Sequence, residues 1–84
     1  MTPLEVVLEG RRLGVRMWLG GVDDDIRVRA DGGTPEVRSW LRGERDKDPT
    51  AFGLAVGIVA AVERGGGDPE RLRDVRELQI VGIQ

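Results

Sequence analysis

Three stretches near the start of the chain alternate between apolar and polar or small residues. They cover residues 4–9, 13–19 and 26–31, and short segments rich in glycine or charge separate them at residues 10–12 and 20–25. An alternation with a period of two is typical of β-strands that bury one face. The pattern therefore predicts three antiparallel strands, joined in chain order as a meander.

Two helices are predicted after the strands, and each opens with a capping residue followed by proline. Thr34 precedes Pro35, and Asp48 precedes Pro49. A side-chain oxygen at the cap accepts a hydrogen bond from a free amide of the first turn, and proline fits the first helical position. The second helix is predicted to run to about Arg64, where three consecutive glycines stop it.

The first of these helices is amphipathic and is predicted to end near Asp46. Its apolar stripe falls at positions i, i+3 and i+4 and consists of Val37, Trp40 and Leu41. The opposite side is polar and is predicted to face solvent with Arg38, Arg42, Glu44 and Arg45.

A short helical turn over residues 68–73 and a last strand over residues 75–83 complete the predicted order β-β-β-α-α-β. Strands with one apolar face bury it against helices. We therefore expect a two-layer α+β fold, in which two main helices lie on one face of an antiparallel sheet. Residues 1–84 are expected to form a single small domain, and the last strand is free to pair beside either the first or the third.

The second helix is unusual because residues 49–62 contain no charged side chain, whereas 33% of the chain is charged. Phe52, Val56 and Val59 form the side that is expected to pack on the sheet. A helix that is apolar all round is normally covered all round, but a two-layer domain covers one side only. A membrane span is not expected, because these residues reach about 21 Å and the hydrocarbon core is roughly 30 Å thick.

The small side of this helix leaves two interpretations open. It consists of Gly53, Gly57, Ala60 and Ala61. In one interpretation it touches solvent or the neighbouring helix of the same chain; in the other it meets the same helix of a second copy. Each glycine inside a helix costs about 1 kcal/mol relative to alanine, and close packing of a partner offsets that cost. This side is therefore the predicted interface of a homodimer or higher oligomer.

A second candidate surface lies on the outward face of the second and third strands. It is predicted to hold Arg16, Trp18, Arg27 and Arg29. Exposed tryptophan among arginines is able to stack on a nucleic-acid base or to bind a protein partner. The alternative is an ordinary solvated sheet face, in which the arginines pair with Glu5 and Glu9 of the first strand.

Composition narrows the chemistry further. The chain has no cysteine and no histidine, so thiol nucleophiles, disulfides and imidazole metal ligands are excluded. It shows no paired-carboxylate signature, and the aspartates at residues 23–25 lack the spacing of a calcium loop. We expect no enzyme activity, no cofactor and no metal ion.

The net charge of −2 and the interleaving of both signs argue against binding a polyanion through bulk charge. The abundance of arginine, with Lys47 the one lysine, is typical of a GC-rich bacterial genome. No export signal is visible, so a cytoplasmic location is expected. The sequence thus predicts a small protein–protein interaction domain that acts as a subunit or adaptor of a larger bacterial assembly, with RNA binding as the alternative.

The segment EVRSWLRGERDKDPTAFGLAVGIVAAVERGGG, followed by ERLRDVRELQIVG, resembles the RelE-type toxins of bacterial toxin–antitoxin systems over residues 36–82. In that family a helical hairpin ends in glycine and is followed by a strand reading Glu-Leu-Arg; here the tripeptide is Glu77-Leu78-Gln79. The resemblance implies ribosome-dependent RNA cleavage or an inactive relative, with Arg76 as the candidate residue near that strand. Three predicted strands precede the helices where the family has about one, and the family's catalytic histidine or tyrosine has no counterpart.

Overall fold

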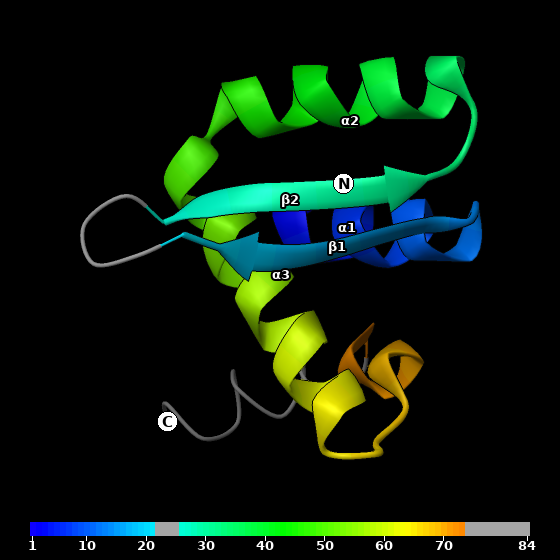
Figure 1. The fold of residues 1–84 in the computed structure, drawn as a ribbon, viewed down its shortest axis with the longest axis vertical. Coiled ribbons are helices and arrows are strands. Elements are labelled where there is room, and N and C mark those ends of the chain that lie inside the picture. The colour runs from blue at the N-terminus through cyan, green and yellow to red at the C-terminus, as the bar shows by residue number, and fades with distance from the viewer. Residues whose placement is uncertain (22–25, 74–84) are drawn as a thin grey trace.

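The computed structural model describes residues 1–21 and 26–73 of the chain (Figure 1). In chain order its elements are α1 (Pro3–Arg12), β1 (Val15–Gly20), β2 (Arg27–Gly32), α2 (Pro35–Lys47), α3 (Pro49–Arg64) and the 3-10 helix η1 (Pro69–Arg71). The predicted α+β class is confirmed, but the predicted order is wrong at its first element, which is a helix. The aspartates at 23–25 and the predicted last strand at 75–83 lie outside the described residues.

Residues 4–9, predicted as a strand, lie in α1. The Thr2 hydroxyl accepts a hydrogen bond from the backbone amide of Glu5, and the Glu5 carboxylate accepts one from the amide of Thr2. This reciprocal pair is a capping box, and Pro3 fits the first helical turn. Three consecutive side chains of α1 are buried, namely Val6, Val7 and Leu8. A strand with alternating faces cannot bury three in a row, so the predicted strand and three-stranded meander are wrong.

The predicted turn at residues 10–12 is also helical and belongs to the end of α1. Gly10 lies there against the core, where an added Cβ would come within 3.0 Å of Leu41 Cδ2 and Met17 Cε. Its small size lets α1 approach both α2 and β1 closely. With Glu5 and Glu9 in a helix, the predicted cross-strand pairs between these carboxylates and the sheet arginines are wrong too.

β1 and β2 form an antiparallel hairpin, as predicted for the second and third strands. The register places Val15, Met17 and Leu19 of β1 on the inner face, which is turned toward the helices. Val15 and Met17 are buried, whereas Leu19 near the far end of the hairpin is exposed. In the described part of the chain the sheet consists of these two strands.

α2 and α3 begin at the prolines predicted from the sequence. The Thr34 hydroxyl accepts a hydrogen bond from the amide of Val37, and an Asp48 carboxylate oxygen accepts one from the amide of Ala51. α3 ends at Arg64 as predicted, and α2 ends one residue beyond the expected Asp46. Capping and proline are local signals, and they determine these bounds without help from the rest of the fold.

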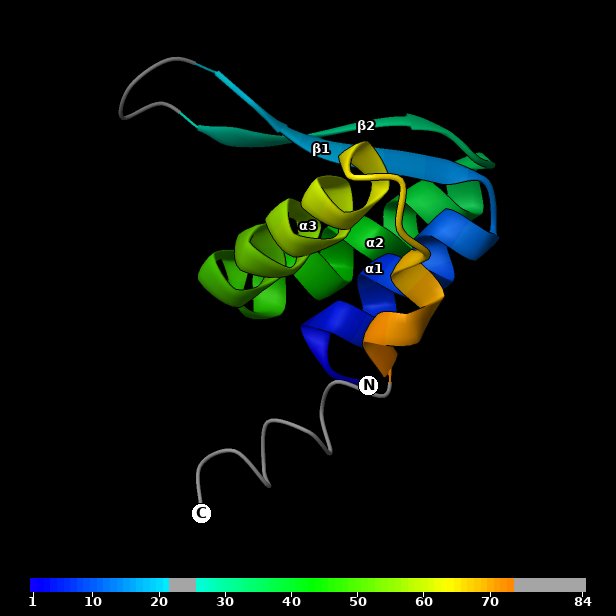
Figure 2. The same cartoon turned by 90° about the horizontal axis from the view of Figure 1, so that it is seen from below.

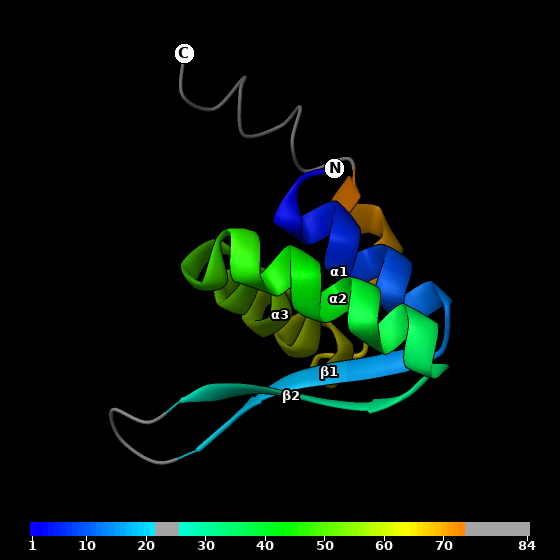
Figure 3. The same cartoon turned by 90° about the horizontal axis from the view of Figure 1, so that it is seen from above.

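Among the described residues, the three α-helices lie on the inner face of the hairpin, and no helix or strand covers its outer face (Figures 2 and 3). α1 packs more extensively on α3 than on any other element. The core between helices and hairpin consists of Val6, Val7, Leu8, Val15, Met17, Leu41, Phe52, Ala55, Val56 and Val59. None of the helices within residues 1–21 and 26–73 has the length and apolar character that crossing a bilayer needs.

η1 follows the glycines that end α3 and brings the chain back to α1. It lies within the short helical turn predicted over residues 68–73. An Asp68 carboxylate oxygen accepts a hydrogen bond from the amide of Glu70, which caps the turn. Arg73 donates to Glu70 at 2.7 Å and lies 3.7 Å from a Glu9 oxygen of α1. The hydrogen bond from Arg73 to Glu70 is the main reason that the pKa of Arg73 is raised above its ordinary value.

Candidate functional site

The outer face of α3 is apolar and open to solvent. Leu54 is 65% exposed and Ile58, one turn further, is 49% exposed. Ala61 follows on the same face and is exposed as well. The opposite face buries Phe52 and Val56 in the core, as the sequence predicted. α3 therefore has a covered apolar face and an uncovered one, because the helices and hairpin surround it on one side only.

The predicted small-residue side of α3 is divided between two surroundings. Gly57 faces β1, where an added Cβ would come within 3.0 Å of Leu19 Cδ1, and Ala60 lines the same groove beside β1. A Cβ added at Gly53 would meet no atom of the described residues within 4 Å apart from its own helical turn. Close packing within the chain thus accounts for Gly57, whereas no contact within the described residues requires glycine at position 53.

An apolar groove joins α3 to the far end of the hairpin. It has a volume of about 510 Å³, and its walls include Leu19 and Ile26 on one side and Gly53 and Leu54 on the other. Leu19 and Ile26 are both exposed. Together with the outer face of α3 they make one surface, the α3–hairpin surface, which consists of Leu19, Ile26, Leu54 and Ile58.

The outer face of the hairpin brings together the second predicted set of residues. Arg29 lies directly across from Trp18, and directly opposed residues point to the same side of a sheet. The same face holds Arg16, Trp18, Arg27 and Arg29, with Asp31 across from Arg16. Trp18 is 42% exposed, and the side-chain stem of Arg29 lies over Gly20, where an added Cβ would come within 2.9 Å of Arg29 Cγ.

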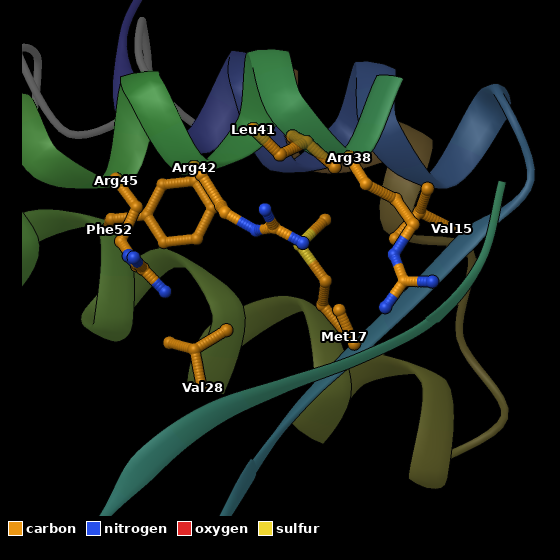
Figure 4. A pocket seen from close by; sticks show the side chains of 9 residues that line it. Val15, Met17, Val28, Arg38, Leu41, Arg42, Arg45 and Phe52 are labelled. Carbon is orange, nitrogen blue, oxygen red and sulfur yellow. The ribbon is translucent and has the colours of Figure 1, made fainter. Parts of the chain in front are cut away.

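A third feature is a cleft between α2 and the inner face of β2, with a volume of about 90 Å³ (Figure 4). Arg38, Arg42 and Arg45 of α2 reach from the helix toward the strands, and Val28 of β2 faces them. The sequence places these arginines on one polar side of α2 and so predicts only solvent contact for them. Their spacing at i, i+4 and i+7 places them on one side of α2. This spacing indicates a shared site only once β2 is known to lie opposite.

Titratable groups do not assemble into a reaction centre in the part of the chain that the structure describes. No group of three or more acidic, histidine or cysteine side chains is placed to hold a metal ion there. No polar or charged residue is buried, and no buried side-chain nitrogen or oxygen lacks a hydrogen-bond partner among these residues. The candidate functional features of the described residues are therefore the three surfaces above.

Comparisons with models of known protein families, with curated proteins and with solved structures give no match to this chain. The resemblance to RelE-type toxins therefore stays a prediction, and its Glu77-Leu78-Gln79 segment and Arg76 lie outside the described residues.

Proposed function

We propose that this chain is a non-enzymatic protein–protein interaction domain that self-associates through the outer face of α3 and serves as a subunit or adaptor of a larger assembly. The observation that carries the proposal is the exposure of Leu54 and Ile58 on adjacent turns of a helix without charged residues between Pro49 and Val62. A helix on the surface of a soluble monomer normally presents a polar outer face. An uncharged outer face is typical of a helix that is covered by a partner.

Two copies of α3 fit one another in an antiparallel pair with a two-fold axis between Gly57 and Ile58. In that arrangement Leu54 of one protomer lies opposite Ala61 of the other, so that a large side chain meets a small one. A Cβ added at Gly53 would meet no described residue outside its own helical turn within 4 Å, which leaves room for close approach. The two-fold axis makes every favourable contact occur twice.

The energetics are compatible with a weak dimer. Complete burial of a fully exposed leucine or isoleucine side chain contributes roughly 1.5 to 3 kcal/mol. Because Leu54 is 65% and Ile58 is 49% exposed in the protomer, the two copies of each that a two-fold pair buries contribute roughly 3 to 7 kcal/mol in total. Leu19 and Ile26 extend the apolar area at the edge of the contact. The sum reaches the lower part of the cost of roughly 4 to 15 kcal/mol for lost translational and rotational freedom, so we expect an association that depends on concentration.

The test is the mass in solution, measured by light scattering coupled to size exclusion over about a hundredfold range of concentration. We expect the wild-type mass to rise toward twice 9.2 kDa, and Leu54→Glu and Ile58→Glu to stay at the monomer mass, because each places a charge in the contact. Ser39→Glu on the exposed side of α2 is the matched control and should associate like wild type. Substitution of Gly57 is a poorer probe, since a side chain there would displace Leu19 within the chain.

Circular dichroism of the two glutamate variants should match wild type, because both positions are exposed in the protomer. A wild-type mass of 9.2 kDa at every concentration would overturn the proposal. So would association that survives both glutamate substitutions.

A second candidate function is RNA binding through the outer face of the hairpin. It is favoured by the register that gathers Arg16, Trp18, Arg27 and Arg29 on one uncovered sheet face. Arginine and exposed tryptophan are the side chains with which proteins hold phosphates and stack unpaired bases. Binding of single-stranded RNA that weakens with salt and is lost in Trp18→Ala would support it.

A further inference from the structure

The cleft between α2 and β2 is suited to a ligand of a different kind. We propose that it binds an extended acidic peptide of a partner protein, which pairs with the edge of β2 that no other described strand covers and places carboxylates against Arg38, Arg42 and Arg45. The outer face of α3 does not line this cleft. The proposal therefore goes beyond self-association and stands whether or not the chain dimerises.

Three positive charges converge on the cleft, and no carboxylate is among the described residues that line it. Arg45 pairs with Asp46 at 3.3 Å, at the end of α2. Arg38 and Arg42 have no ion pair with any residue of the described ranges. Like charges held close together repel one another, and an anionic ligand in the cleft relieves that repulsion while it gains charge-assisted hydrogen bonds.

The spacing of the arginines fits an extended chain. Arg38 and Arg42 are one helical turn apart, about 6 Å along the axis of α2 at 1.5 Å per residue. Alternate side chains of a strand point to the same face and are spaced by about 6.8 Å. α2 and β2 run alongside one another (Figures 1 and 3), so a strand added beside β2 also runs along α2. Acidic residues at alternate positions of such a strand therefore meet successive arginines.

The edge of β2 provides the backbone pairing. Within the residues that the structure describes, β2 pairs with β1 alone, which leaves amide and carbonyl groups on its other edge. Extended peptides add to exposed edges of this kind through main-chain hydrogen bonds. α2 packs chiefly on α1 and α3 rather than on the sheet, and Ala30 on the inner face of β2 is exposed, so no described helix closes the inner side of this edge.

The floor of the cleft favours a peptide over a nucleic acid. It is formed by aliphatic and thioether groups such as Met17 and Val28, on which the methylenes of a glutamate side chain are able to lie. The aromatic ring in the lining belongs to Phe52, which is 2% exposed and therefore cannot stack on a base. A volume of about 90 Å³ is also well below the roughly 300 to 1,000 Å³ that is common for small-molecule sites.

The experiment titrates the full chain, labelled with nitrogen-15, with a blocked peptide of about eight residues in which Glu alternates with Thr. We expect amide shifts along Val28 to Ala30 and shifts of the guanidinium Nε–H signals of α2. A peptide of the same composition with its glutamates grouped at one end, and one with Lys in place of Glu, should bind at least tenfold more weakly.

Arg42→Gln should weaken binding of the alternating peptide about tenfold or more, because it removes a charge-assisted contact. Arg12→Gln is the matched control, since it makes the same change of charge on the exposed end of α1 and should leave affinity within twofold. Ile58→Glu should bind the peptide like wild type even where it abolishes self-association, because Ile58 lines neither the cleft nor the groove beside it, so the two proposals fail separately.

Several outcomes would overturn the proposal: no binding by the alternating peptide, equal losses in Arg42→Gln and Arg12→Gln, or peptide shifts confined to the outer sheet face around Trp18. Shifts of the cleft residues on simple concentration without peptide would assign the cleft to a second copy of the chain. Shifts of the cleft residues with an oligouridylate instead of the peptide would assign it to nucleic acid.

Discussion

Gly33 and Gly43 are both exposed glycines, but their backbone conformations differ. Gly33 ends the turn between β2 and α2 with φ of +74°, a conformation that residues with a Cβ rarely adopt, and an added Cβ would collide with Val15 Cγ2. Gly43 lies within α2, where an added Cβ would meet no other part of the described structure within 4 Å. The first glycine is required by the fold, and the second is not.

We therefore expect opposite effects from the same substitution. Gly33→Ala should lower the free energy of unfolding by about 1 to 3 kcal/mol, because the strained backbone and the contact with Val15 both oppose it. Gly43→Ala should raise it by about 0.5 to 1 kcal/mol, since alanine loses less backbone entropy in a helix. Urea denaturation followed by circular dichroism measures both, and equal effects of the two changes would contradict this account.

Residue type alone predicts some side-chain environments and not others. The burial of Phe52 and Leu41 follows from the apolar stripes of their helices, and both are buried. The exposure of Leu54 does not follow, because it depends on how far the hairpin reaches over α3. The role of the arginines in the cleft is equally hard to predict, because it depends on the distance between α2 and β2. No local sequence pattern gives that distance.

At the scale of elements, α1 is where periodicity and capping disagree. Leu4, Val6 and Leu8 alternate with polar or smaller neighbours, yet Leu4, Val7 and Leu8 also fit helical spacing. The cap decides between them, because Thr2 and Glu5 form the reciprocal hydrogen bonds that start a helix. The same cap-then-proline signal correctly locates α2 and α3, so the information that identifies α1 is present in the sequence.

Thr2→Ala should therefore lower the free energy of unfolding by about 1 kcal/mol, because the Glu5 amide loses its side-chain acceptor. Thr50→Ala is the control: this threonine lies inside α3, is exposed, and should change stability by less than about 0.5 kcal/mol. Thermal or urea unfolding of the two variants compares them directly. A Thr2→Ala variant as stable as wild type would mean that the capping box does not hold α1.

At the scale of the whole molecule, charge is distributed unevenly between faces. The net charge is −2, but among the paired residues of β1 and β2 the outer face of the hairpin carries three arginines and one aspartate. A surface of this kind holds an anion locally without attracting polyanions over long range. RNA binding at this face therefore depends on the side chains of the face itself and on the salt concentration.

If RNA is the ligand of that face, three phosphate contacts from Arg16, Arg27 and Arg29 give a slope of about −2 for log affinity against log salt. Trp18→Ala should then weaken binding of single-stranded RNA about tenfold or more through lost stacking, with the slope unchanged. Arg29→Gln should make the slope shallower by about 0.7. Fluorescence anisotropy with labelled oligouridylate measures both quantities, and binding that is indifferent to Trp18 would reject this function.

The packing of α1 on α3 has a consequence for synthesis. Arg11 and Glu63 are joined by an ion pair at 3.0 Å although they lie 52 positions apart in the chain. A ribosome adding about 5 to 20 residues per second needs roughly 3 to 10 s to cover that separation. Throughout that interval the apolar side of α1 is outside the ribosome or in its exit tunnel without its main partner. α1 is thus made before α3 but is buried only when α3 follows, and this part of the nascent chain is most exposed to aggregation and to chaperones just before α3 emerges.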